Sequence, residues 1–188
     1  TVNAGGAITQ SAAITASGTS SFTATGEGDI TLTNAGNDFN TVSLTASGGY
    51  GGAVRVVDAN ALTVSALAAG ANKAVSVAAG GTLGTTGAIS GGDVTLSGAT
   101  GLTRGHTVTS TGTAGDAIVL NAGSGYFLNT RGADALTVSA NGRWSLYAQD
   151  SAKVTLGGLS PGFKQYGLSY GTAPTAMGDG LSGLLYAV

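Results

Sequence analysis

The sequence has no cysteine and few charged residues, and both shortages exclude classes of protein. Without cysteine, the chain forms neither disulfides nor metal sites with thiolate ligands. Its seven Lys and Arg residues are spread singly, so they do not build the basic face that neutralises nucleic-acid phosphates. We therefore expect no nucleic-acid partner.

Long hydrophobic runs are missing as well. No window approaches the roughly twenty consecutive apolar residues that a membrane-spanning helix needs. The opening segment, TVNAGGAITQ, contains neither a basic start nor a hydrophobic block. The sequence therefore predicts no membrane insertion and no signal peptide.

Small residues are abundant, whereas charged and aromatic residues are scarce. Glycine alone occupies 34 positions, whereas charged residues make up 9% and aromatic residues 6% of the chain. Glycine disfavours helices, while Thr and Val favour a pleated surface. Disordered chains usually combine low hydrophobicity with high net charge, but here the mean hydropathy is positive and the net charge is only −2. These values predict a folded, all-β protein.

Short runs of alternating apolar residues recur along the chain in two interleaved series, with steps of roughly twenty residues. The first series is Ile30, Val54, Val75, Val94, Ile118, Leu136 and Val154. The second series is Phe22, Val42, Leu62, Leu83, Val108, Phe127 and Trp144. A fixed period of this kind is typical of a solenoid, in which each strand stacks on its counterpart one coil away. The pattern predicts a right-handed parallel β-helix (β-solenoid) of about seven irregular coils over residues 1–158.

A β-sandwich or barrel is the alternative all-β fold. Such folds usually join antiparallel strands through tight Asn-Gly or Asp-Gly hairpins. The sequence has only two such dipeptides, Asn141-Gly142 and Asp179-Gly180. The parallel β-helix is therefore the favoured architecture.

Four acids recur one or two residues before an inward apolar residue, namely Asp29, Asp93, Asp116 and Asp134. A short carboxylate at such a place can accept hydrogen bonds from backbone amides that a turn leaves unpaired. Asn34 and Asn37 fall in a neighbouring corner, where Asn tolerates a left-handed backbone. We interpret all six residues as structural turn residues.

No constellation of residues predicts catalysis, a metal site or a cofactor. The acids are scattered, with Asp29 and Asp38 the only close pair in sequence. General acid and base work on a glycan needs two carboxyl groups about 5 to 9 Å apart, which sequence spacing alone does not provide. His106 is the single histidine, so a histidine-rich metal cluster is impossible. A glycan-binding or glycan-cleaving β-helix stays an alternative.

The tail, residues 159–188, is richer in large apolar residues than the rest of the chain. We expect it either to cap its own last coil or to donate a strand to a neighbouring subunit. Trp144 shares a face with Leu146 in the run RWSLYA, which favours a buried plug over an exposed platform for a sugar. The cap or interface candidates are Trp144, Leu159, Phe163, Tyr166, Tyr170, Leu185 and Tyr186.

Three segments resemble the β-helical repeats of filamentous-haemagglutinin-like exoproteins, the adhesins that bacteria export by two-partner secretion. They are GDITLTNAGNDFNTVSLTA, VVDANALTVSAL and NGRWSLYAQDSAKVTLGGLSPGFKQYGLSYG. In the last, the residues that match the family's closing segment are Gly142, Arg143, Trp144, Tyr147, Gly157, Gly158, Leu159, Phe163, Gln165 and Tyr166. We expect recognition by a transporter pore to lie outside these residues, which do not match the secretion-signalling domain of such proteins, and the sequence contains no Arg-Gly-Asp triplet for integrin-type attachment.

The resemblance implies an extracellular protein at the bacterial cell surface, in which this chain is part of the shaft of an adhesin or biofilm filament. Its partners would be host or bacterial surface glycans or proteins. Two further alternatives stay open on the residues alone. The chain is a self-assembling fibre subunit joined through its tail, or a Thr-rich solenoid that orders water and binds ice.

Overall fold

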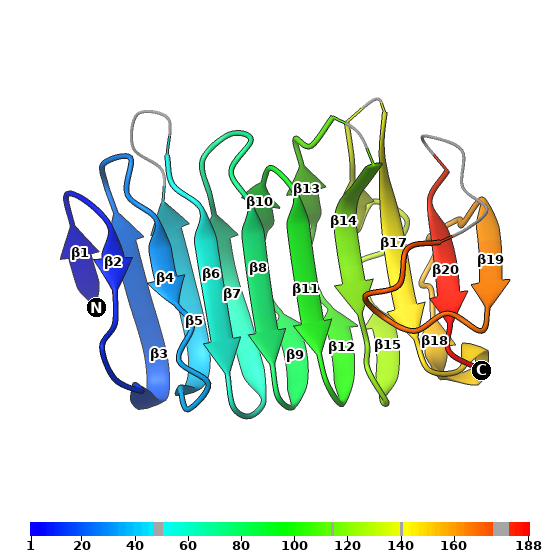
Figure 1. The fold of residues 1–188 in the computed structure, drawn as a ribbon, viewed down its shortest axis with the longest axis horizontal. Coiled ribbons are helices and arrows are strands. Elements are labelled where there is room, and N and C mark those ends of the chain that lie inside the picture. Colours follow the sequence, from blue (N-terminus) through cyan, green and yellow to red (C-terminus); the bar gives the residue numbers. More distant parts are fainter. Residues whose placement is uncertain (47–50, 114, 140, 175–180) are drawn as a thin grey trace.

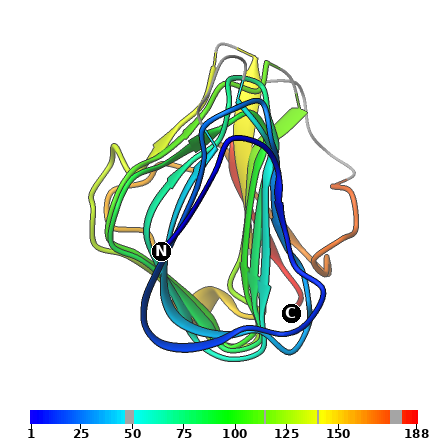
Figure 2. The same cartoon turned by 90° about the vertical axis from the view of Figure 1, so that its left-hand side faces the viewer.

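A computed structural model describes residues 1–46, 51–113, 115–139, 141–174 and 181–188. These residues form twenty β-strands and one short 3-10 helix, η1 (Ser151–Lys153). Every strand pairs in parallel with a strand one turn away, which confirms the right-handed parallel β-solenoid. The solenoid has about eight turns, one more than expected (Figure 1). Viewed along its axis, it shows stacked coils with a roughly triangular outline (Figure 2).

A nine-stranded sheet forms the face turned toward the viewer in Figure 1. Its strands follow the coil order except at the C-terminal end, where β20 lies between β17 and β19. In spatial order they are β2 (Ile8–Thr9), β4 (Ile30–Leu32), β6 (Val54–Asp58), β8 (Val75–Ala79), β11 (Val94–Gly98), β14 (Gly115–Asn121), β17 (Gly142–Ala148), β20 (Gly183–Tyr186) and β19 (Phe163–Tyr166).

An eleven-stranded sheet covers the opposite side of the interior. Its main path is β1 (Val2–Ala4), β3 (Thr15–Ala24), β5 (Asp38–Ala46), β7 (Leu62–Ala68), β9 (Thr82–Thr85), β12 (Gly101–Arg104), β15 (Tyr126–Asn129) and β18 (Val154–Thr155). A branch leaves this path because β7 also pairs with β10. The branch consists of β10 (Ile89–Gly91), β13 (Val108–Ser110) and β16 (Leu136–Thr137).

One apolar row runs along the inner face of the nine-stranded sheet through seven of its strands, from β2 to β17. The paired residues are Ile8, Ile30, Val54, Val75, Val94, Ile118 and Trp144, and none is more than 6% exposed. Five members of the first predicted series therefore lie in one row, as expected. The assignment of Leu136 and Val154 to that row is wrong, because both lie in the eleven-stranded sheet. The step from Ile118 to its true partner, Trp144, is longer than the earlier steps, so a fixed period falls short of it.

The second predicted series mixes three rows of the eleven-stranded sheet, and its last member, Trp144, was wrongly assigned because it lies in the nine-stranded sheet. Leu62, Leu83, Leu102, Phe127 and Val154 form one row. Phe22, Leu44, Leu67, Ile89, Val108 and Leu136 form another, which crosses onto the branch. Two rows on one sheet have the same local alternation, so periodicity alone does not separate them.

The third row of the eleven-stranded sheet turns polar along the axis. From Val42 and Val64 it continues with Thr85, Arg104 and Asn129, all of them buried. The Arg104 side chain is fully enclosed, and its Nη2 donates to the backbone oxygen of His106 at 2.7 Å. Its Nε and Nη1 have no partner among the described residues. Burial lowers the pKa of Arg104 to about 9, so the guanidinium is still charged at neutral pH.

Replacing Arg104 by methionine is expected to stabilise the protein by about 1 to 3 kcal/mol. An enclosed charge without a carboxylate partner pays a desolvation cost that an apolar side chain of similar length does not. The measurement is urea unfolding, and the matched control is Arg55→Met, which removes an exposed arginine with a 3.5 Å ion pair to Asp29. The control should change stability by less than about 0.5 kcal/mol. Loss of stability in Arg104→Met would show that the guanidinium has a stabilising partner inside the coil.

The tail extends the nine-stranded sheet of its own chain. β20 pairs with β17, and β19 pairs with β20, so both tail strands find partners within the chain. Tyr166 on β19 is in register with the buried Tyr186, yet it is 58% exposed because β19 is the last strand of the sheet. The two strands of the tail therefore continue the solenoid wall of their own chain.

Candidate functional site

The buried corner residue Asn37 joins three successive coils. Its Nδ2 donates to the backbone oxygens of Leu32 and Val57 and to the side-chain oxygen of Gln10, at 3.0 to 3.1 Å. Its Oδ1 accepts from the backbone nitrogen of Ile14 and from the Gln10 amide. Asn37 itself is fully buried, and its bond to the Leu32 backbone oxygen is buried as well, while the other bonds are partly buried.

The other two predicted turn residues of this region lie nearer the surface. Asn34 is exposed, and its Oδ1 accepts from the backbone nitrogen of Gly36 at 2.9 Å, an Asx-type turn. The Asp29 carboxylate accepts from the backbone nitrogen of Ala53 in the next coil at 2.8 Å. It also forms an ion pair with Arg55 at 3.5 Å. Asp29 thus holds one coil to the following one through a backbone amide.

The three remaining predicted turn acids have different surroundings. Asp93 is exposed beside a polar hollow of about 290 Å³, and its carboxylate accepts no hydrogen bond from the described residues. Asp134 forms an ion pair with Arg131 at 2.7 Å. Asp116 does not lie in a turn, because it is part of β14, where the register shifts at a β-bulge. None of these three carboxylates accepts from a backbone amide of the described residues.

Two buried polar residues that the sequence did not single out hold corners together. Asp58 accepts from the backbone nitrogen of Phe39 at 2.7 Å and from that of Asn60 at 3.0 Å. Asn129 donates to the backbone oxygens of Gly132 and Leu156. Both residues follow an apolar run, whereas the predicted acids precede one. A search for polar residues at the ends of strands would have found them.

Most of the cap or interface candidates are buried in the wall of the last coils. Trp144, Leu159 and Tyr186 belong to the main core, each with 7% exposure or less. Trp144 is therefore a core residue, and its ring does not offer an exposed platform for a sugar. Leu185 is fully buried, and Phe163 is half-buried against it in a smaller cluster on the outer side of the sheet.

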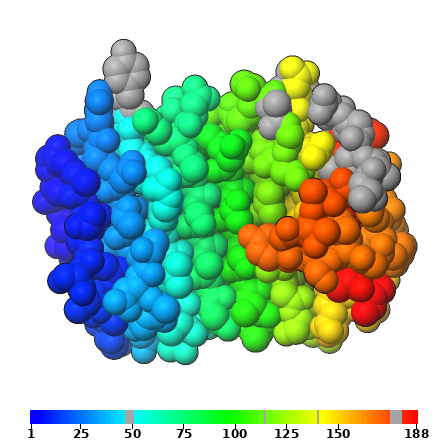
Figure 3. Space-filling model, viewed as in Figure 1, coloured from blue at the N-terminus to red at the C-terminus, as the bar shows by residue number. Residues whose placement is uncertain are grey.

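That smaller cluster holds a segment of the tail, residues 167–173, against the outer face of the nine-stranded sheet. Leu168 packs with Tyr147 and Leu185, and its backbone nitrogen donates to the backbone oxygen of Tyr186 at 2.9 Å. The Tyr147 hydroxyl donates to the backbone oxygen of Thr172 at 3.1 Å. Figure 3 shows the orange tail as a raised ridge across the green and yellow strands.

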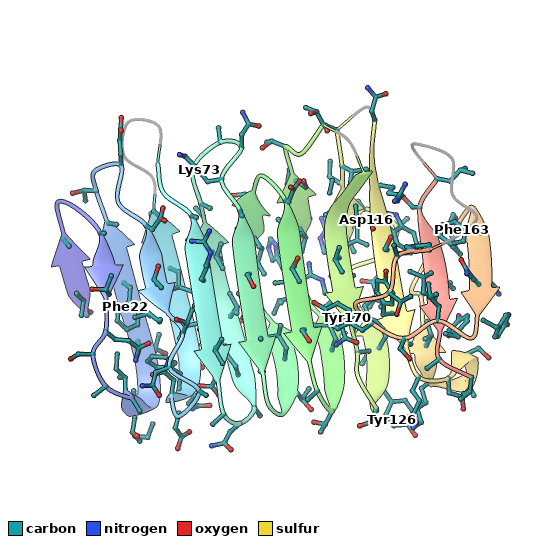
Figure 4. The ribbon with its side chains drawn as sticks, viewed as in Figure 1. Phe22, Lys73, Asp116, Tyr126, Phe163 and Tyr170 are labelled. Atoms are coloured by element: carbon teal, nitrogen blue, oxygen red, sulfur yellow. The ribbon has the colours of Figure 1, made fainter. Side chains whose placement is uncertain are left out.

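The ridge and the sheet enclose a cleft around two tyrosine rings, which we call the tyrosine cleft. Tyr170 is 46% exposed and meets the buried Tyr147 edge to face, with ring centroids 5.4 Å apart. A hollow of about 360 Å³ extends from this pair toward Thr95 and Asp116. A second hollow of about 190 Å³ extends toward Gln149. Figure 4 shows Tyr170 in front of the sheet with Asp116 above it.

Asp116 is the polar centre of the larger hollow. One carboxylate oxygen, Oδ1, accepts from Nε of Arg143 and from Oγ of Ser145, both at 2.6 Å. The pKa of Tyr147 is raised by burial and, to a smaller extent, by the charge of Asp116. The phenol therefore stays protonated at neutral pH and keeps its hydrogen bond to the tail. The cleft is held in place by these bonds without a ligand.

The structure offers less support for a metal site or for the regular threonine array of an ice-binding surface. No three His, Asp or Glu side chains of the described residues gather closely enough to hold a metal ion. Over the same ranges, no helix is long and apolar enough to cross a membrane. An outward row of threonines on the eleven-stranded sheet, Thr41, Thr63 and Thr103, is interrupted by Gly84 and continues into Leu128.

Comparison with known proteins adds one partial match. A family model described as repeats of unknown function (DUF5649) matches residues 1–46. That segment forms β1 to β5, the first coils of the solenoid. No curated protein and no solved structure matches the chain. The match agrees with a repeating solenoid and assigns no activity to it.

Proposed function

We propose that the chain is a structural shaft segment of a bacterial surface adhesin or biofilm filament, and that it supports attachment without catalysis. The observation that carries this proposal is the apolar row from Ile8 to Trp144, which continues unbroken through seven successive strands, from β2 to β17. A hydrogen-bonded wall with a continuous core extends along one axis, which suits a spacer that holds binding surfaces away from a cell.

The sequence resemblance to filamentous-haemagglutinin-like exoproteins supports the same proposal. Those proteins are exported to the bacterial surface, and their shafts consist of parallel β-helical repeats. The low charge and the absence of cysteine suit a chain that crosses a pore in an extended form. Each coil would then gain its core by stacking on the coil before it as the chain emerges.

Attachment of living cells tests the proposal. Bacteria that carry the intact chain on a surface anchor are expected to bind epithelial cells or one another more than bacteria that carry the anchor alone. The amount of chain at the surface is matched by antibody staining. Equal attachment of the two strains in both assays would contradict a role in adhesion.

A further inference from the structure

We propose that the tyrosine cleft binds a neutral oligosaccharide, with one sugar ring stacked on Tyr170. This inference rests on the proposed attachment function and names the chemistry of a partner. It follows from the exposed ring, the polar groups on both sides of it and the charge of the lining.

The exposed ring provides a stacking surface. Tyr170 leaves 46% of its surface to solvent, although its edge-to-face contact with Tyr147 fixes its position. A sugar ring presents C–H bonds on its face and hydroxyls at its rim. The apolar face can therefore cover the tyrosine ring, while the hydroxyls remain free for polar partners.

The two hollows suit a chain of sugars more than a single one. Asp116 pairs with Arg143 at the start of β17, whereas Gln149 follows the end of that strand. The hollows that these residues line both adjoin Tyr147 and Tyr170, so they extend in opposite directions along β17. The larger one lies within the range of about 300 to 1,000 Å³ that is usual for small-molecule sites. An oligosaccharide along β17 would place sugars in both hollows.

The polar groups that line the two hollows can form hydrogen bonds with sugar hydroxyls. Asp116 uses Oδ1 for Arg143 and Ser145, and its Oδ2 has no hydrogen bond among the described residues. A carboxylate oxygen is a strong acceptor for a hydroxyl hydrogen. Thr95 adds a hydroxyl to the same hollow, and Gln149 adds an amide to the other one.

The charge of the cleft favours a neutral ligand. Asp116 is the one ionisable acid or base among the lining residues of the two hollows apart from the tyrosines. Its ion pair with Arg143 is largely enclosed, since the Arg143 side chain is only 13% exposed. A sulfated or carboxylated sugar would face a carboxylate without an exposed cation opposite it. Anionic glycans are therefore disfavoured here.

The backbone of the tail makes the cleft ready for binding. Leu168 anchors one end of the ridge in the small outer cluster, and Thr172 is fixed by the Tyr147 hydroxyl. Between them, the backbone nitrogen of Thr172 donates to the backbone oxygen of Ser169 at 3.1 Å, which closes a turn around Tyr170. A platform that is ordered before binding loses little entropy when the ligand arrives.

Titration calorimetry of the intact chain tests this inference. The probes are cellotetraose, maltotetraose, mannotetraose, a galactotetraose and triacetylchitotriose, with a heparin tetrasaccharide as the anionic comparison. We expect at least one neutral probe to bind with a dissociation constant of about 1 mM or below. Tyr170→Ala should weaken that binding at least about tenfold, and Tyr170→Phe, which keeps the ring, should retain it.

The matched control is Tyr126→Ala. Tyr126 is 68% exposed on β15 of the other sheet, away from the cleft (Figure 4), so its loss should leave binding unchanged. Absence of binding by every neutral probe, or equal binding by Tyr170→Ala, would overturn the inference. A preference for the heparin fragment would overturn its neutral character. If attachment of cells persists while saccharide binding fails, the cleft assignment is wrong and the shaft proposal stands.

Discussion

Replacing Val75 by aspartate is expected to lower the free energy of unfolding by more than about 4 kcal/mol. Val75 is 1% exposed and lies in the apolar row between Val54 and Val94. A carboxylate at this place would be enclosed by apolar neighbours with no cation in the row. The damage should extend to the coils on both sides, because each coil forms part of the core of the next.

The adjacent residue provides the control. Ser76 is exposed on the outer face of the same strand, and its partners are Arg55 and Thr95. Ser76→Asp should therefore change stability by less than about 0.5 kcal/mol. Urea unfolding followed by circular dichroism measures both variants. Similar midpoints for Val75→Asp and Ser76→Asp would contradict the inward and outward alternation on which the whole register depends.

Replacing Asn37 by alanine is expected to cost about 2 to 4 kcal/mol. The change leaves the backbone oxygens of Leu32 and Val57 without their amide donor inside a buried corner. It also removes the acceptor of the Ile14 backbone nitrogen, so the loss reaches three coils. A buried polar group that loses its partner has given up its hydrogen bonds to water without replacement, which lowers the stability of the folded state.

Asn34→Ala is the matched control for this prediction. Asn34 lies three positions earlier and makes one exposed turn contact to Gly36 through its Oδ1. Its loss should cost about 0.5 kcal/mol, since water can replace an exposed acceptor. Thermal unfolding of both variants gives the comparison. Equal losses would show that the buried network around Asn37 does not stabilise the corner beyond an ordinary turn.

The architecture could be predicted from the sequence because one row has nearly regular steps. Ile30, Val54, Val75, Val94 and Ile118 are all β-branched and lie in one register. The end of that row could not be predicted, because the long corner before Trp144 breaks the period. The hexapeptide ALTVSA occurs at 61–66 and at 135–140, and its Leu-Thr pair lies in the eleven-stranded sheet both times, a signal that the two-series interpretation overlooked.

Asn37 was assigned to a corner from the sequence, but its burial was not predicted. The residue type indicates a turn, whereas the enclosure comes from Gln10 of the preceding coil and Val57 of the following one. For Asp116 the assignment to a turn was itself wrong. Its position before an apolar run suggested a turn, but a bulge in β14 keeps it within the strand.

The tyrosine cleft was not predicted, because it depends on where the tail folds. The alternation in RWSLYA correctly separates inward Trp144 from outward Tyr147. Tyr147 is nevertheless buried, since the ridge around Leu168 covers the outer face there. An outward aromatic residue in a strand, together with an apolar tail that needs a surface, was the signal available in the sequence.

The apolar row has a consequence for how such a rod can change in length. The step from Val75 to Val94 is shorter than the step from Ile118 to Trp144, yet both pairs keep the same register. Extra residues are therefore absorbed at corners, where the entropic cost of a longer loop rises slowly. A single residue inserted within a strand would instead turn its inner face outward, unless a β-bulge absorbs it as in β14. Duplication or loss of a whole coil preserves every row, so recombination between repeats can lengthen or shorten the rod without redesigning its interior.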